Sequence, residues 1–187
     1  MRKAVVLILC LTIFAGAAAA GTDAGSKEIQ VQGSLTRSTN SENDDQDYTL
    51  TGVLVANYFL VPQFSFGTAL LLSGSVAIPE SGDETRMVVT FIQLRADLYL
   101  TGGASSVVPY IGAQGGVANY MVESEGYSDT STSLAYGAHG GFKFFTTENT
   151  SWNLEGNVNI YKPDVEDNED DVSYTDMSLL LGFSYYF

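Results

Sequence analysis

The chain has 187 residues, and its 22 acidic side chains outnumber its 8 basic ones, which gives a formal net charge of −14. This acidic balance excludes nucleic acid as a partner, because binding a phosphate backbone requires clustered Lys and Arg. The length is sufficient for one domain.

The N terminus has the pattern of a secretory signal peptide. Arg2 and Lys3 precede an apolar run over residues 4–14, and the small residues that follow suit cleavage after Ala20. The alternative is an N-terminal membrane anchor, but the apolar stretch is short for a span of about 20 residues.

We therefore expect a signal peptide over residues 1–20 and a mature domain over residues 21–187. Cys10 lies inside the apolar run, too early to be a lipidated first residue of the mature protein. The mature domain then has no cysteine, which excludes disulfides and thiol chemistry.

After residue 26 the sequence shows the period-two alternation of β-strands and no helical periodicity of useful length. In the last stretch the odd-numbered residues from Thr175 to Phe187 are mostly apolar and increasingly aromatic, whereas most residues between them are small, polar or acidic. We predict eight strands, at about Lys27–Arg37, Tyr48–Leu60, Phe64–Ile78, Arg86–Leu100, Val107–Val122, Ser131–Phe145, 152–161 and Ser173–Phe187.

The connections between these strands are of two kinds. Polar, acidic segments at residues 39–47, 79–85, 123–130 and 163–171 alternate with shorter, nearly neutral turns at 61–63, 102–106 and 146–150. In an antiparallel barrel the two kinds fall at opposite ends, and long outer loops with short periplasmic turns are typical of an outer-membrane barrel. Aromatic residues also gather near the strand ends, as two interfacial bands require.

Alternation alone does not decide which face points outward, because a soluble, lipocalin-like barrel alternates as well. Here the polar face is rich in Asn, Gln, Gly and Ser, and few charged residues fall within the strands. The exterior of a soluble barrel normally carries many more charges. We therefore predict an all-β, eight-stranded antiparallel up-and-down transmembrane β-barrel with its apolar face toward lipid.

Several segments resemble small eight-stranded outer-membrane barrels, the OmpA-like, OmpX-like and OmpW-like group. They are Asn57–Gly67 (NYFLVPQFSFG), Pro109–Gly112 (PYIG), Gly140–Phe145 (GGFKFF) and Gly182–Phe187 (GFSYYF). The resemblance covers nearly the whole mature domain. It implies location in the outer membrane, in contact with membrane lipids and lipopolysaccharide.

The terminal strand also resembles the assembly signal of bacterial outer-membrane barrels. This likeness rests on the aromatic residues Phe183, Tyr185 and Phe187. It implies that periplasmic chaperones and the barrel-assembly machinery recognise them. Because no peptidoglycan-binding domain follows, the sequence gives no support for an anchoring role like that of full-length OmpA.

An eight-stranded barrel is just wide enough to be filled by its own side chains. The predicted inward faces carry a lumen polar cluster of mixed charge, which comprises Arg95, Asp97, His139, Lys143, Glu155 and Asp176. Because buried charges need partners, we expect Glu155 to pair with Lys143 or Arg95. The cluster would plug the lumen or, as the alternative, line a narrow conducting path.

We expect no enzyme, no catalytic residue and no cofactor. His139 is the one histidine, and Gly140 and Gly141 follow it in place of the histidine-x-serine pattern of outer-membrane deacylases. The acidic run 164–171 lacks the glycine and the fixed spacing of an EF-hand loop. We therefore expect no specific metal site, and at most weak binding of divalent cations at the acidic loops.

The sequence favours a small, monomeric, integral outer-membrane protein with a structural or surface-exposed role. One alternative is a narrow channel for small or hydrophobic solutes, which the OmpW-like resemblance implies. Another is an adhesin or ligand-binding surface formed by the acidic loops. The last is a soluble periplasmic barrel of the lipocalin kind.

Overall fold

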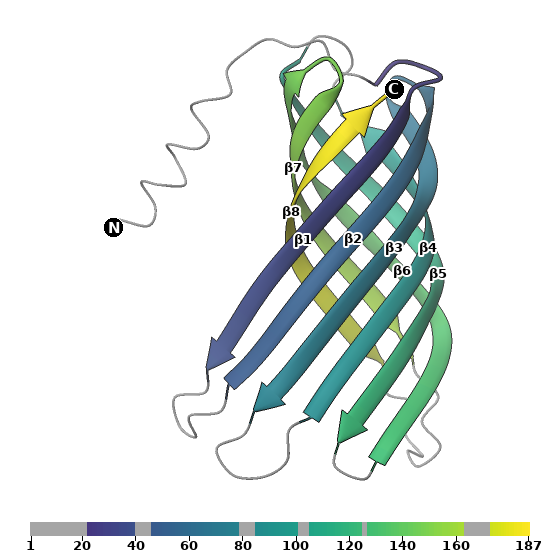
Figure 1. Cartoon of the computed structure of the whole chain (residues 1–187). Coiled ribbons are helices and arrows are strands. Elements are labelled where there is room, and N and C mark those ends of the chain that lie inside the picture. Colours follow the sequence, from purple (N-terminus) through teal and green to yellow (C-terminus); the bar gives the residue numbers. More distant parts are fainter. Residues whose placement is uncertain (1–21, 40–45, 79–84, 101–104, 125–126, 163–172) are drawn as a thin grey trace, which may run out of the picture.

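The computed structural model describes residues 22–39, 46–78, 85–100, 105–124, 127–162 and 173–187. These residues form eight strands that pair in chain order and close into an antiparallel barrel (Figure 1). The strands are β1 (Lys27–Thr39), β2 (Gln46–Val61), β3 (Phe64–Ile78), β4 (Thr85–Tyr99), β5 (Val107–Ser124), β6 (Tyr127–Thr147), β7 (Thr150–Tyr161) and β8 (Tyr174–Tyr186). The predicted fold class is confirmed. In the described part of the chain, no helix is long and apolar enough to cross a membrane.

One predicted connection is wrong. Residues 123–130 are mostly strand, because β5 and β6 stay paired as far as Ser124 and Tyr127. This part of the two strands is rich in polar residues on both faces, so no hydrophobic alternation marks it as strand. The predicted signal peptide and most of the other three acidic connections lie outside the described residues.

The two ends of the barrel differ in what they carry. β1 begins and β8 ends at one end, here called the near end, which is at the top of Figure 1. The tight turn at Pro62–Gln63 lies at this end as well. β1 ends and β8 begins at the opposite end, here called the far end, which is the end at which the acidic connections were predicted.

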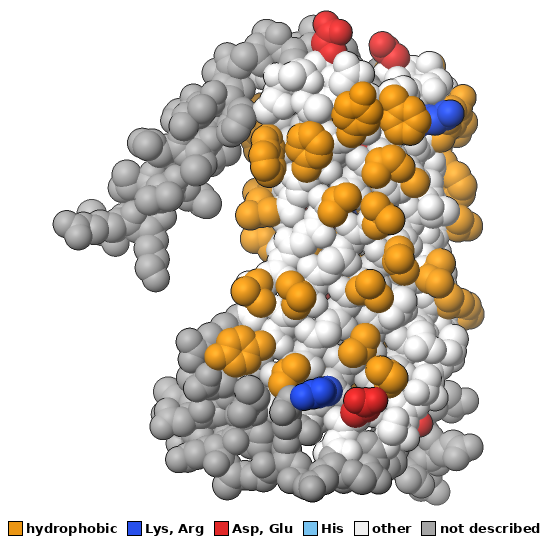
Figure 2. All heavy atoms as spheres, viewed as in Figure 1, with side chains coloured by type: hydrophobic (Ala, Val, Ile, Leu, Met, Phe, Trp, Pro, Cys, Tyr) orange, Lys and Arg blue, Asp and Glu red, His pale blue; other side chains and the backbone are white. Residues whose placement is uncertain are grey.

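The outer wall of the barrel is apolar. Leu134, Leu35 and Met177 expose 79%, 75% and 74% of their surface. Figure 2 shows hydrophobic side chains spread over the wall, with charged side chains at its two ends on the face in view. The soluble, lipocalin-like alternative is therefore wrong, because such a barrel would point this face inward.

The near-end aromatic residues divide between the two sides of the wall. An outward set is exposed and comprises Tyr58, Phe66, Phe142, Trp152, Phe183, Tyr185 and Phe187. An inward set is fully buried and comprises Phe59, Tyr99, Tyr110, Phe145 and Tyr186. The outward set forms the expected interfacial band, and the inward set closes the near end of the lumen.

The interior is layered along the barrel axis, as β4 shows. From the near end its inward residues are Tyr99, then the charged pair Asp97 and Arg95, then Gln93, then Phe91 and Val89. The last two belong to a buried apolar layer with Val53, Val55, Ala69, Leu71, Ala118, Ala135, Tyr161 and Leu180. The sequence did not predict this layer, because β2 is apolar on both faces around Val53–Ala56 and its alternation is obscured there.

Candidate functional site

The charged side chains of the lumen come mainly from β4, β6 and β7. Arg95 and Asp97 lie on β4, His139 and Lys143 on β6, and Glu155 on β7. All five are buried. Successive residues of a strand point to opposite faces, and all five of these residues occupy inward positions. Their side chains therefore point into the lumen.

Glycines on neighbouring strands make this space large enough. Gly112 lies opposite His139, and a Cβ at residue 112 would come within 2.1 Å of His139 Nε2. Gly141 lies opposite Glu155, and its Cβ would come within 2.0 Å of the Leu154 carbonyl oxygen. The absence of a side chain at both positions lets the charged groups and the strands approach closely.

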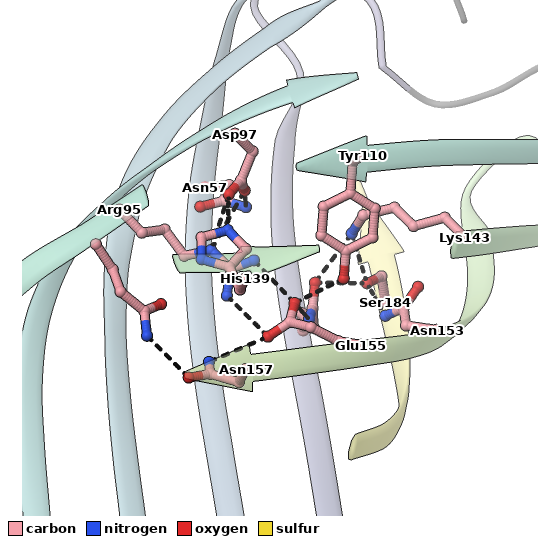
Figure 3. A network of polar contacts seen from close by, with 12 residues as sticks. Asn57, Arg95, Asp97, Tyr110, His139, Lys143, Asn153, Glu155, Asn157 and Ser184 are labelled. Carbon is pink, nitrogen blue, oxygen red and sulfur yellow. Dashed lines mark hydrogen bonds and ion pairs between the residues drawn. The ribbon is translucent and has the colours of Figure 1, made fainter. Parts of the chain in front are cut away.

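Arg95 joins the two central carboxylates (Figure 3). Its Nε donates to Asp97 Oδ1 at 3.1 Å, and its Nη2 donates to Glu155 Oε2 at 2.9 Å. The predicted pairing of Glu155 with Arg95 is confirmed. The Oδ1 atom of Asp97 is also paired with His139 Nε2. A guanidinium can bridge carboxylates from two strands because its donors form a planar fork.

Lys143 pairs with Glu28 of β1. Its ammonium also donates to Gln30 Oε1 at 2.9 Å, and Glu28 accepts a further hydrogen bond from Tyr186 Oη at 3.0 Å. The Lys143 Nζ lies 5.8, 5.1 and 5.7 Å from the ring centroids of Tyr99, Tyr110 and Tyr186. Aromatic rings at this distance stabilise an ammonium that has lost its water.

Neutral donors complete the shells of the central carboxylates. Asp97 accepts from Asn57 Nδ2 at 2.8 Å and from Ser65 Oγ at 3.3 Å. Glu155 accepts from Tyr110 Oη at 2.6 Å. Each carboxylate therefore has a cationic partner and neutral partners, which is the condition under which buried charges are tolerated.

A layer of amides covers the charged groups on their far side. Gln93 donates to Asn159 Oδ1 at 2.9 Å, and Gln114 donates to Asn157 and Asn159 at 3.0 and 2.7 Å. Asn159 donates in turn to Asn157 at 2.9 Å. These bonds tie β4, β5 and β7 together across the lumen.

Asp176 is the member of the predicted cluster that the structure sets apart. It faces the inside of β8, but its Oδ1 has no hydrogen-bond partner, and no ion pair joins it to another described residue. Glu28, the partner of Lys143, was not among the predicted lumen residues. Glu28 could have been predicted from the sequence, because it shares its strand face with Gln30 and Gln32, which the alternation places inside the barrel.

The fold and the family agree. The model of the family described as outer membrane protein beta-barrel domain matches residues 6–187. The chain belongs to this family. A search of curated protein sequences found no match.

Solved outer-membrane barrels share the architecture at low identity. Neisserial surface protein A is 17% identical with a TM-score of 0.61, over 91% of this chain and 99% of that one. OprG from Pseudomonas aeruginosa is 14% identical with a TM-score of 0.50, over 88% and 97%. At such identities the likeness shows the fold alone.

In this outer-membrane barrel three inner layers lie one behind another across the lumen. The aromatic layer is at the near end, the polar network follows, and the apolar layer occupies the far half. Arg95, Lys143 and Glu155 have exposed fractions of 1% or less, so neither layer admits solvent to the charges. The lumen is therefore filled by the inward side chains of the strands themselves.

Proposed function

We propose that the chain is a rigid integral protein of the outer membrane whose lumen is closed to solutes and whose role is structural or surface-exposed. The observation that carries this proposal is the filled lumen, in which the charged groups are buried and paired with one another. A barrel of this kind serves as a fixed base for the segments that join its strands at the far end.

Single-channel recording in planar bilayers tests closure. We expect the refolded protein to give no conductance steps above those of a protein-free membrane, because a network of ion pairs crosses the whole lumen. A general porin, reconstituted in the same way, serves as the positive control. Reproducible steps from the wild-type protein would favour the narrow channel instead.

The acidic far-end segments favour a second candidate, a binding surface. Asp47, Glu123 and Asp129 lie at the far ends of described strands, beside the further acidic residues of the connecting segments. Such a surface would attract basic partners or divalent cations. Replacing the acidic residues of 164–171 by Ser and Asn should leave the barrel folded. If the surface has this role, the replacement should abolish adhesion to cells or binding of calcium, measured on whole bacteria and by calorimetry.

We assign no catalytic role to the network. His139 directs its Nε2 to Asp97, and its Nδ1 has no hydrogen-bond partner among the described residues. A serine nucleophile would have to lie within hydrogen-bond reach of the histidine that activates it. This geometry supports a structural use of the histidine.

The terminal aromatic residues supply the expected assembly signal, and Phe187 provides the test. Its ring lies on the outer wall at the near end, as the ring of Phe142 does, so Phe187→Ala and Phe142→Ala should change the stability of the folded barrel by similar amounts. We expect Phe187→Ala to reduce the amount of protein in the outer membrane severalfold. Envelope fractionation with a heat-modifiable gel shift measures the amount, and urea titration in lipid vesicles measures the stability. Phe142→Ala, another exposed near-end position, is the control, and equal amounts of the two variants would remove the proposed signal.

A further inference from the structure

The seam between β1 and β8 is paired over the near half of the barrel and unpaired over the far half. Pairing runs from Glu28 opposite Tyr186 to Gly33 opposite Leu181 and stops there, although β1 continues to Thr39. β7, the other neighbour of β8, pairs along nearly its whole length. Figure 1 shows β8 beside β1 toward the near end, and the two strands diverging below.

The divergence leaves backbone groups without their expected partners. Lys27 and Phe187 exchange both backbone hydrogen bonds, at 2.9 and 3.0 Å, so residues of the same parity point their N–H and C=O groups into the seam. Beyond Gly33 these residues are Leu35, Arg37 and Thr39 on β1, and Leu179, Met177 and Thr175 on β8. Unpaired backbone is costly at membrane depth unless water or polypeptide satisfies it. A ligand that fills this seam would therefore need backbone N–H and C=O groups that pair with those of the two strands.

Unsatisfied side chains line the inner edge of the same seam. Gln32 exposes 4% of its surface, and neither its Nε2 nor its Oε1 has a hydrogen-bond partner among the residues that the structure describes. On β8 the Ser178 Oγ and the Asp176 Oδ1 likewise form no hydrogen bond within the described part of the chain. The carboxylates of the polar network, in contrast, are all paired. The seam thus offers a carboxylate oxygen and a hydroxyl that accept or donate no hydrogen bond within the described barrel.

The inward positions of β8 give these groups an order. From the far end they read Asp176, Ser178 and Leu180, and Leu180 is fully buried in the apolar layer. Asp176 is the next residue after Tyr174 on the same face of β8. The rings of Tyr174 and Tyr161 stack, with 5.8 Å between their centroids. An extended chain lying antiparallel to β8 would therefore meet an apolar site, a hydroxyl and a carboxylate at every second residue.

We propose that the far half of the β1–β8 seam accepts an extended, amphipathic polypeptide segment with a basic residue, added as a strand to the free edge of β8. The segment's backbone pairs with Leu179 and Met177, its basic side chain contacts Asp176, and its alternate apolar residues face lipid beside those of β8. Main-chain bonds supply affinity and the side-chain pair supplies selectivity, as in other cases of strand addition. The acidic net charge of the protein increases the local concentration of such a segment. This inference goes beyond the closed-barrel function and does not depend on it.

The probe is the fluorophore-labelled peptide Ala-Leu-Thr-Val-Lys-Val, whose Thr and Lys would lie opposite Ser178 and Asp176. Fluorescence anisotropy measures its binding to the folded barrel in lipid nanodiscs. We expect Asp176→Asn to weaken binding about tenfold or more, because a charge-assisted contact is lost. Asp129→Asn, the same charge change on β6, should leave binding unaltered. Asp176→Lys should reverse the preference, toward a peptide with Glu in place of Lys.

Two further arms separate strand addition from charge attraction alone. A peptide with Pro in place of the first Val lacks a backbone donor and should lose binding. Amide exchange followed by NMR should show Leu35, Leu179 and Met177 exchanging rapidly in the free barrel, while Val31 and Phe183 in the paired half stay protected. The peptide should protect Leu179 and Met177. The proposal is overturned if the proline peptide binds equally well, if Asp176→Asn has no effect, or if the seam amides are protected from the start.

Discussion

Replacing Arg95 by methionine should lower the free energy of unfolding of the barrel by about 3–5 kcal/mol. The guanidinium is the shared partner of Asp97 and Glu155, and its side chain is 1% exposed. Methionine has a similar volume and leaves both carboxylates buried beside an apolar group. Urea titration in lipid vesicles measures the change, and the emission of Trp152, the one tryptophan, reports folding.

Three further variants show whether the loss comes from uncompensated charge. Arg86→Met removes an exposed cation from the same strand and should cost less than about 1 kcal/mol. Arg95→Lys keeps the charge but loses the fork, and should lie between the two. Adding Asp97→Asn and Glu155→Gln to Arg95→Met should recover part of the stability, because the stranded charges are removed. Equal destabilisation by Arg86→Met and Arg95→Met would contradict the central role of the network.

The sequence was sufficient for the wall because one physical rule governs it. Each strand has one face toward lipid and one toward the lumen, so the period-two pattern gave the strands, and β3 was predicted at both ends as Phe64–Ile78. The same parity placed Arg95, Asp97, His139, Lys143 and Glu155 inside. The confirmed pairing of Glu155 with Arg95 followed from that placement and from the cost of an unpaired buried charge.

The features that the sequence did not give depend on distances between strands. The choice of Glu28 over Glu155 as the partner of Lys143 is set by contacts across the lumen, between strands far apart in the chain. The apolar layer around Phe91 is hidden wherever both faces of a strand are apolar. The divergence of β1 from β8 beyond Gly33 has no counterpart in the alternation, which continues through both strands.

Two adjacent glycines on β5 show that the inner and outer faces of the wall differ in the space they leave for a side chain. Gly116 points inward, and a Cβ there would lie 2.0 Å from the Ile92 carbonyl oxygen of β4. Gly115 points outward, and the nearest atom to its Cβ would be 3.8 Å away, which is ordinary contact. The first site lies against the backbone of a neighbouring strand, and the second has room for a methyl group.

We therefore expect Gly116→Ala to destabilise the barrel by about 1–3 kcal/mol, because β4 and β5 must move apart to admit the methyl group. Gly115→Ala should be neutral or stabilise by up to about 1 kcal/mol, because alanine restricts the unfolded chain. Urea titration in vesicles compares the two directly, with chemistry, strand and sequence context held constant. Equal effects would mean that β4 and β5 separate readily. A large difference would show that inward glycines set how closely the strands pack, and hence how tightly the polar network inside them is enclosed.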